Sequence, residues 1–175
     1  MRTARSIGVA ATALATLGFV AVGPATPAAA SVTEVDWRNA TFDVPAIGAC
    51  PADRVHFTDG SADTGAGVYR FTPGQPVRYA DVTGEGVTDA LAVLDCGPPG
   101  SEYTSALVGL TTRADGTTIR TLGPVVVAPD WTTTIGDVTT WYGDVAVLLT
   151  GSDGDRQTRY YRWASSAQAF VRIDG

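Results

Sequence analysis

Short runs of apolar or alternating residues, separated by Gly, Pro and Asp, dominate the chain after Ser31. Such runs between turn-forming residues are typical of β-strands, and these are rich in the Thr, Val and aromatic residues that strands prefer. The pattern predicts strands at Arg54–Phe57, Gly67–Phe71, Val77–Ala80, Asp89–Leu94, Ser105–Thr112, Thr117–Leu122, Thr132–Ile135, Val145–Thr150, Thr158–Trp163 and Ala169–Ile173, with one or two more within Val32–Phe42. Asp115-Gly116 predicts a hairpin turn, because Gly accepts a positive φ.

Two segments of the chain resemble each other. The segment 81–89 begins Asp-Val-Thr and leads into the apolar run 90–94, and the segment 137–144 begins in the same way and leads into 145–149. The match suggests a duplicated sheet unit. We therefore expect an all-β fold of antiparallel, blade-like meanders. They would pack either as a sandwich of small sheets or as an open propeller fragment, because a closed propeller usually needs at least about four blades.

The start of the chain has the pattern of a secretory signal peptide. Arg2 and Arg5 precede the apolar run Ser6–Val22, and Gly and Pro residues then lead to Ala28-Ala29-Ala30. The run is 17 residues long, whereas a membrane-spanning helix needs about 20. The sequence thus predicts a signal peptide at 1–30, no membrane span, and a single secreted all-β domain at 31–175.

Composition excludes several classes of function. The 175 residues include 12 Lys+Arg and 18 Asp+Glu, for a net charge of −6, and nucleic-acid binding calls for a basic face instead. The chain has a single His, which cannot form a multi-His metal centre. An oxidising compartment permits disulfides, so we expect the two cysteines, Cys50 and Cys96, to pair as a structural bridge.

The segment 81–89 offers oxygen atoms at alternate positions. They belong to the side chains or carbonyls of Asp81, Thr83, Glu85, Val87 and Asp89. Gly86 stands where calcium loops turn sharply, and Ca²⁺ prefers six to eight oxygen ligands. The spacing is compatible with a calcium site. The alternative is a structural turn, because Asp and Gly are common in any β-turn.

The stretch Tyr79–Ala90 resembles the FG-GAP (integrin α-type) repeat family, in particular small secreted bacterial proteins with one such loop. The family's loops follow Asp-x-[Asp/Asn/Thr]-Gly-Asp-Gly-x-x-Asp before a strand. The resemblance implies a Ca²⁺-stabilised loop and a β-meander. This chain departs from the pattern with Glu85 in place of Asp, and in the second segment Trp141 replaces a ligand.

These features favour a secreted, non-enzymatic binding or structural module with an extracellular protein or polysaccharide as its partner. Trp141 is the residue expected to form an exposed ligand platform. The alternative is a small secreted hydrolase that uses His56 or an Asp/Glu pair, although no familiar catalytic motif is present. No catalytic residue is assigned.

Overall fold

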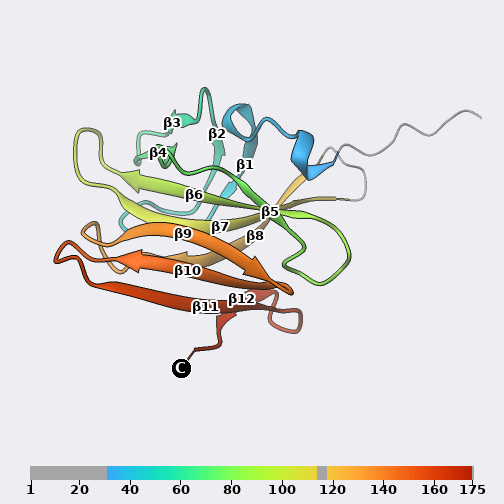
Figure 1. The fold of residues 1–175 in the computed structure, drawn as a ribbon. Coiled ribbons are helices and arrows are strands. Elements are labelled where there is room, and N and C mark those ends of the chain that lie inside the picture. Colours follow the sequence, from blue (N-terminus) through green and yellow to red (C-terminus); the bar gives the residue numbers. More distant parts are fainter. Residues whose placement is uncertain (1–30, 114–117, 175) are drawn as a thin grey trace, which may run out of the picture.

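The computed structural model describes residues 31–113 and 118–174 (Figure 1). The expected signal peptide at 1–30 and the expected turn at Asp115-Gly116 lie outside the described residues. The strands are β1 (Thr41–Val44), β2 (Asp53–His56), β3 (Ser61–Asp63), β4 (Val68–Phe71), β5 (Arg78–Ala80), β6 (Asp89–Gly97), β7 (Thr104–Thr112), β8 (Ile119–Val127), β9 (Thr134–Trp141), β10 (Asp144–Thr150), β11 (Arg156–Ala164) and β12 (Ala169–Arg172). Among the described residues, no helix has the length and apolar character needed to cross a membrane.

The strands form three antiparallel sheets. The N-terminal sheet pairs β1 with β2, the central sheet has the order β3-β4-β6-β7-β8, and the C-terminal sheet has the order β12-β11-β10-β9. Strand β5 also pairs with β6, beside its first residues, whereas β4 pairs with its last ones. The fold is thus all-β, as predicted, and the C-terminal sheet is a four-stranded meander. The sheets stack as a sandwich, and no propeller is formed by the described residues.

Two apolar clusters hold the three sheets together. One cluster lies between the N-terminal and central sheets and includes Phe42, Phe57 and Phe71. The other lies between the central and C-terminal sheets and includes Leu91, Val145 and other strand residues. All nine residues of β6 are buried, because both faces of the central sheet are covered. This explains why the sequence 89–97 shows no polar alternation.

Several expected boundaries were wrong. Within Val32–Phe42 the chain forms two short 3-10 helices, η1 (Val32–Glu34) and η2 (Trp37–Asn39), before β1 begins. The short strand β3 was missed. Strand β8 continues past Leu122 through Gly123 and Pro124, where the register with β7 shifts. Because β8 is an edge strand, the missing N–H of Pro124 is tolerated there.

The second segment of the presumed repeat is not a loop. Residues 137–141 belong to β9, and a two-residue turn, Tyr142-Gly143, connects β9 directly to β10. Both turn residues have positive φ, 49° and 85°, as a tight hairpin of this type requires. Residues 81–88 connect the paired strands β5 and β6, whereas only Tyr142-Gly143 connects β9 and β10.

Candidate functional site

The loop between β5 and β6 is stabilised by its own carboxylates. Asp89, the first residue of β6, is 1% exposed. Its Oδ2 accepts hydrogen bonds from the backbone N–H groups of Val82 (3.1 Å) and Thr83 (3.3 Å) and from the Thr83 hydroxyl (3.3 Å). A buried carboxylate needs such partners, since leaving it unpaired would cost several kcal/mol. Asp89 therefore anchors the start of the loop to the start of β6.

Asp81 stabilises the other half of the same loop. Its Oδ1 accepts from the Gly84 N–H at 2.8 Å, and its Oδ2 accepts from the Gly86 N–H at 2.8 Å. Both glycines have φ of 76°, a conformation that other residues rarely adopt. This geometry is that of a well-formed structural turn.

The structure brings together only some of the expected calcium ligands. The Thr83 hydroxyl oxygen lies 3.5 Å from Asp81 Oδ1 and 3.3 Å from Asp89 Oδ2, so these three side chains converge. Glu85 and Val87 are exposed, and among the described residues no hydrogen bond joins either of them to that group. Within residues 31–113 and 118–174, no cluster of three or more His, Cys, Asp or Glu residues is arranged to hold a metal ion.

Because Asp89 is buried, its contribution to the stability of the folded state depends on pH, and this dependence can be measured. Desolvation raises the pKa of its carboxyl above the usual 3.8, against the opposing effect of the hydrogen bonds it accepts from Thr111, Val82 and Thr83. The folded state therefore holds the proton more tightly than the unfolded state. The resulting stabilisation is complete below pH 3.8 and is lost as the pH rises through the raised pKa.

We expect the variant Asp89→Asn not to lose stability in this way as the pH rises. Its amide oxygen still accepts hydrogen bonds from the loop N–H groups but carries no charge. Its free energy of unfolding relative to the parent should rise as the pH increases from 3.8 through the raised pKa, and should then level off. Urea unfolding at a series of pH values measures the difference. Asp153→Asn, in the exposed β10–β11 loop, is the matched control. A difference between Asp89→Asn and the parent that does not vary with pH would contradict the assignment.

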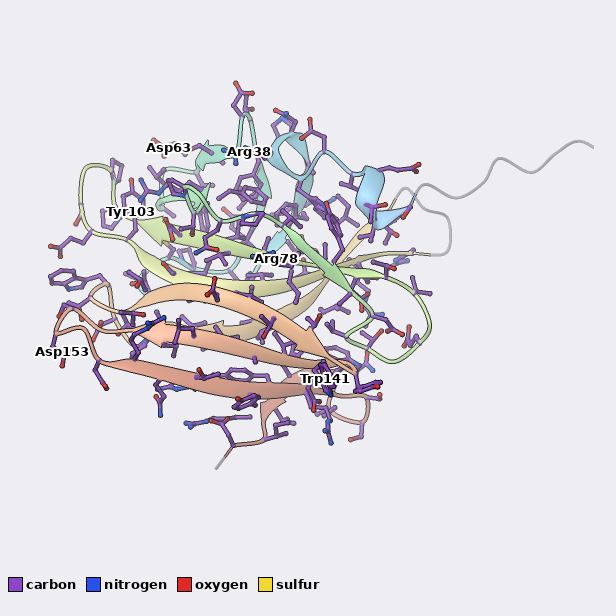
Figure 2. All side chains as sticks on the ribbon, viewed as in Figure 1. Arg38, Asp63, Arg78, Tyr103, Trp141 and Asp153 are labelled. Carbon is purple, nitrogen blue, oxygen red and sulfur yellow. A yellow bond between two sulfur atoms is a disulfide. The ribbon has the colours of Figure 1, made fainter. Side chains whose placement is uncertain are left out.

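The β9–β10 turn lies beside the Asp81 loop. A Cβ placed on Gly143 would lie 3.6 Å from the Asp81 carbonyl oxygen. The turn displays two aromatic side chains, Trp141 (75% exposed) and Tyr142 (94% exposed), whose rings meet edge to face at 5.2 Å. The exposure predicted for Trp141 is confirmed, and the loop that sequence singled out lies next to it (Figure 2).

Among the residues that the structure describes, no other sheet covers one face of the C-terminal sheet. Residues Val145, Val147 and Leu149 of β10 belong to the apolar cluster beneath the sheet. Because side chains alternate along a strand, Ala146 and Leu148 point the opposite way. We call this opposite side the outer face. By the same alternation and by strand register, it carries Asp137, Thr139, Trp141, Asp144, Ala146, Leu148, Arg156, Thr158, Tyr160, Arg162 and Val171.

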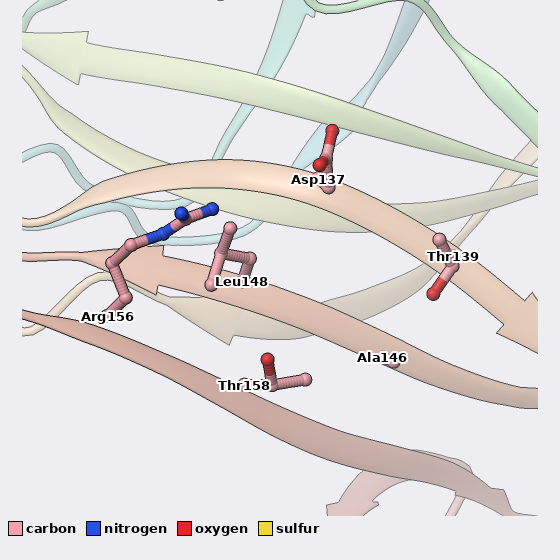
Figure 3. Close-up of a pocket in the computed structure, with 6 residues that line it drawn as sticks. All are labelled: Asp137, Thr139, Ala146, Leu148, Arg156 and Thr158. Atoms are coloured by element: carbon pink, nitrogen blue, oxygen red, sulfur yellow. The ribbon is translucent and has the colours of Figure 1, made fainter.

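A groove of about 450 Å³ crosses the outer face (Figure 3). Its floor is made of short or apolar side chains, and charged side chains stand at its border. The lining residues are Asp137, Thr139, Ala146, Leu148, Arg156 and Thr158, from three adjacent strands. In Figure 3 the Arg156 side chain extends from β11 across β10. The groove thus combines an apolar floor with hydroxyl, carboxylate and guanidinium groups.

The end of the outer face nearest the β9–β10 turn is ordered by an ion pair. Arg162 donates from Nε to Asp144 Oδ1 (2.6 Å) and from an Nη atom to Oδ2 (2.7 Å). The Arg162 guanidinium lowers the pKa of the Asp144 carboxyl. Trp141 is the register partner of Asp144 on the other side, so the ion pair and the indole stand in one cross-strand row. Sequence reasoning missed this row, although the alternation Asp137-x-Thr139-x-Trp141 signals an outward-facing set.

The remaining expected residues lie away from this face. The Cys50–Cys96 disulfide is present and buried, and it joins the turn after β1 to β6. His56 is exposed on β2, where its Nδ1 lies 2.7 Å from the Thr41 hydroxyl oxygen. His56 does not line the outer-face groove.

Comparison with known proteins does not assign the chain to a family. No protein-family model matches the chain, and no curated protein or solved structure matches it.

Proposed function

We propose that the protein is an exported, non-enzymatic binding module that holds a polysaccharide on the outer face of its C-terminal sheet. The observation that carries the proposal is Trp141, a large aromatic side chain that is 75% exposed and lies two positions along β9 from Thr139, which lines the groove. Apolar side chains of this size are normally buried, so their exposure beside a groove marks binding surfaces.

The chemistry of the outer face suits a sugar chain. A pyranose ring has flat C–H faces, which pack on an aromatic ring or on small apolar side chains. Its hydroxyl groups both donate and accept hydrogen bonds, as do the hydroxyls of Thr139 and Thr158. Tyr160 is 46% exposed on β11 and is the register partner of Ala146 on the neighbouring strand, so it offers a second ring on the same face.

Export is part of the proposal. The signal-peptide pattern at 1–30 supports it, and a buried disulfide is typical of oxidising compartments. The Asp81–Asp89 loop, which resembles an FG-GAP loop, would then serve to support the neighbouring Trp141 turn. The hydrolase alternative gains nothing from His56, whose imidazole is exposed and faces a threonine rather than a carboxylate.

The variant Trp141→Ala tests the proposal. Affinity for the best ligand among laminarin, xylan, galactomannan and hyaluronan should fall about tenfold, because the main stacking surface is lost. Intrinsic fluorescence and isothermal titration calorimetry measure the binding. Tyr79→Ala is the matched control: this tyrosine is 41% exposed but lies on β5 of the central sheet, and its loss should leave affinity unchanged. Absence of binding across the panel, or equal losses in both variants, would remove the proposal.

Calcium binding by the loop remains a separate prediction. The convergence of Asp81, Thr83 and Asp89 oxygens supports it. Millimolar Ca²⁺ should raise the melting temperature and EDTA should lower it, because an ion that binds only the folded state stabilises that state. Asp81→Asn should abolish the shift, whereas Asp153→Asn should retain it. If calorimetry shows no calcium-dependent shift in the parent, the loop is a structural turn alone.

A further inference from the structure

A second cavity, of about 280 Å³, lies where the central sheet meets the beginning of β9. Its walls include Arg70 from β4, Asp95 from β6, Ser105 from β7, and Thr72, Tyr103 and Trp131 from neighbouring loops. None of its lining residues belongs to the outer-face groove. Its volume is just below the range for small-molecule sites, about 300–1,000 Å³, which limits it to a small ligand.

A buried carboxylate organises the cavity. The Asp95 side chain is 6% exposed. Its Oδ1 accepts from the Thr72 hydroxyl (2.6 Å) and the Ser105 hydroxyl (2.8 Å), and its Oδ2 accepts from Arg70 Nε (3.2 Å). A charge buried at the end of an apolar strand is costly unless it is paired in this way. These bonds hold the polar groups in fixed orientations before any ligand arrives.

The same hydrogen bonds determine what the cavity can offer. A hydroxyl that donates to Asp95 keeps its lone pairs, so Thr72 acts as an acceptor toward a ligand. Arg70 donates to Asp95 through Nε and keeps N–H groups on its Nη atoms, for which no partner is found among the described residues. Acceptor and donor therefore stand side by side. The lining holds one ion pair, Arg70–Asp95, and is neutral overall.

Two aromatic side chains complete the walls. The Arg70 guanidinium lies 3.8 Å from the centroid of the Tyr103 ring, which fixes both groups against each other. Trp131, in the loop between β8 and β9, is 54% exposed and lines the cavity. Figure 2 shows Tyr103 at the end of the molecule opposite Trp141. An exposed indole beside fixed donors and acceptors is suited to a ligand with one flat apolar face and several hydroxyls.

We propose that this cavity binds a single uncharged hexopyranose unit, which packs a C–H face on Trp131 and exchanges hydrogen bonds with Thr72 and Arg70. The neutral lining disfavours a charged ligand, because an added anion or cation would lose hydration without a net opposite charge to meet it. The proposal does not depend on polysaccharide binding at the outer face, since the two sites share no residue.

Calorimetric and NMR titrations with glucose, galactose, mannose and N-acetylglucosamine test the proposal, with glucuronic acid and inorganic phosphate as charged probes. At least one neutral sugar should bind more tightly than either charged probe. Trp131→Ala should lower the affinity for that sugar about tenfold. Tyr79→Ala, on β5 and in the lining of neither site, should leave it unchanged.

A second variant keeps the test independent of one side chain. Thr72→Val preserves the shape of the side chain and removes the acceptor, so it should also lower the affinity for the sugar. Thr72→Ser should restore binding. The proposal is overturned if no neutral sugar binds, if glucuronic acid or phosphate binds more tightly, or if Trp131→Ala binds like the parent. Loss of monosaccharide binding in Trp131→Ala with unchanged polysaccharide binding would separate this cavity from the outer face.

Discussion

Replacing Cys50 and Cys96 together with alanine is expected to lower the free energy of unfolding by about 4 kcal/mol. The two half-cystines are 46 positions apart, and their bridge removes the entropy of a long loop from the unfolded chain. The bridge is buried, and Gly67 packs on it so closely that an added Cβ would lie 2.7 Å from the Cys50 sulfur. Without the bridge, the turn after β1 keeps the hydrogen bond that the Tyr69 hydroxyl of β4 donates to the Pro51 carbonyl.

Urea unfolding measures this loss. Dithiothreitol should bring the parent protein close to the stability of the double variant and should leave the double variant unchanged, because only the parent has a bond to reduce. Equal stability of the oxidised parent and the double variant would show that the bridge contributes nothing.

Phe42→Ala should cost about 3–5 kcal/mol, the usual range for removal of a buried ring. Phe42 is 1% exposed and stacks on Phe57 with centroids 5.0 Å apart. It also meets Trp37 and Phe71 edge to face, so one truncation opens a cavity in the centre of the cluster between the N-terminal and central sheets.

The matched control for Phe42→Ala is Trp141→Ala, which removes a larger ring from a site that is 75% exposed. Surface substitutions of this kind usually change stability by no more than about 0.5 kcal/mol. Thermal and urea unfolding of both variants give the comparison. Similar losses in the two variants would contradict the assignment of Phe42 to the core and of Trp141 to the surface.

Local sequence patterns predicted the strands well where an apolar run between turn-forming residues marked them. The run 105–112 is nearly the whole of β7, and 145–150 is β10 apart from its first residue. The pairing of Cys50 with Cys96 followed from their number. The pattern failed at β9, where Asp and Gly between 136 and 144 indicated a loop. There the alternation of Val138 with outward-facing neighbours prevailed over the turn-forming character of single residues.

The groove on the outer face and the second cavity could not be predicted from spacing, because each joins residues that only sheet pairing brings together. Thr139 and Thr158 share the groove through their common neighbour β10. Arg70 reaches Asp95 because β4 pairs with the last residues of β6. The loop at 81–89 was found because its residues are consecutive, but sequence did not reveal that its carboxylates accept hydrogen bonds from the loop itself.

We propose above all that the outer face of the C-terminal sheet holds a polysaccharide. Methyl NMR during titration with the best-binding polysaccharide of the panel tests it most directly, because β10 carries a built-in comparison. The methyl signals of Ala146 and Leu148, which face outward, should shift, whereas those of Val145 and Val147, which lie in the cluster beneath, should not. Shifts confined to other parts of the chain, or no shifts with any polysaccharide of the panel, would contradict the claim.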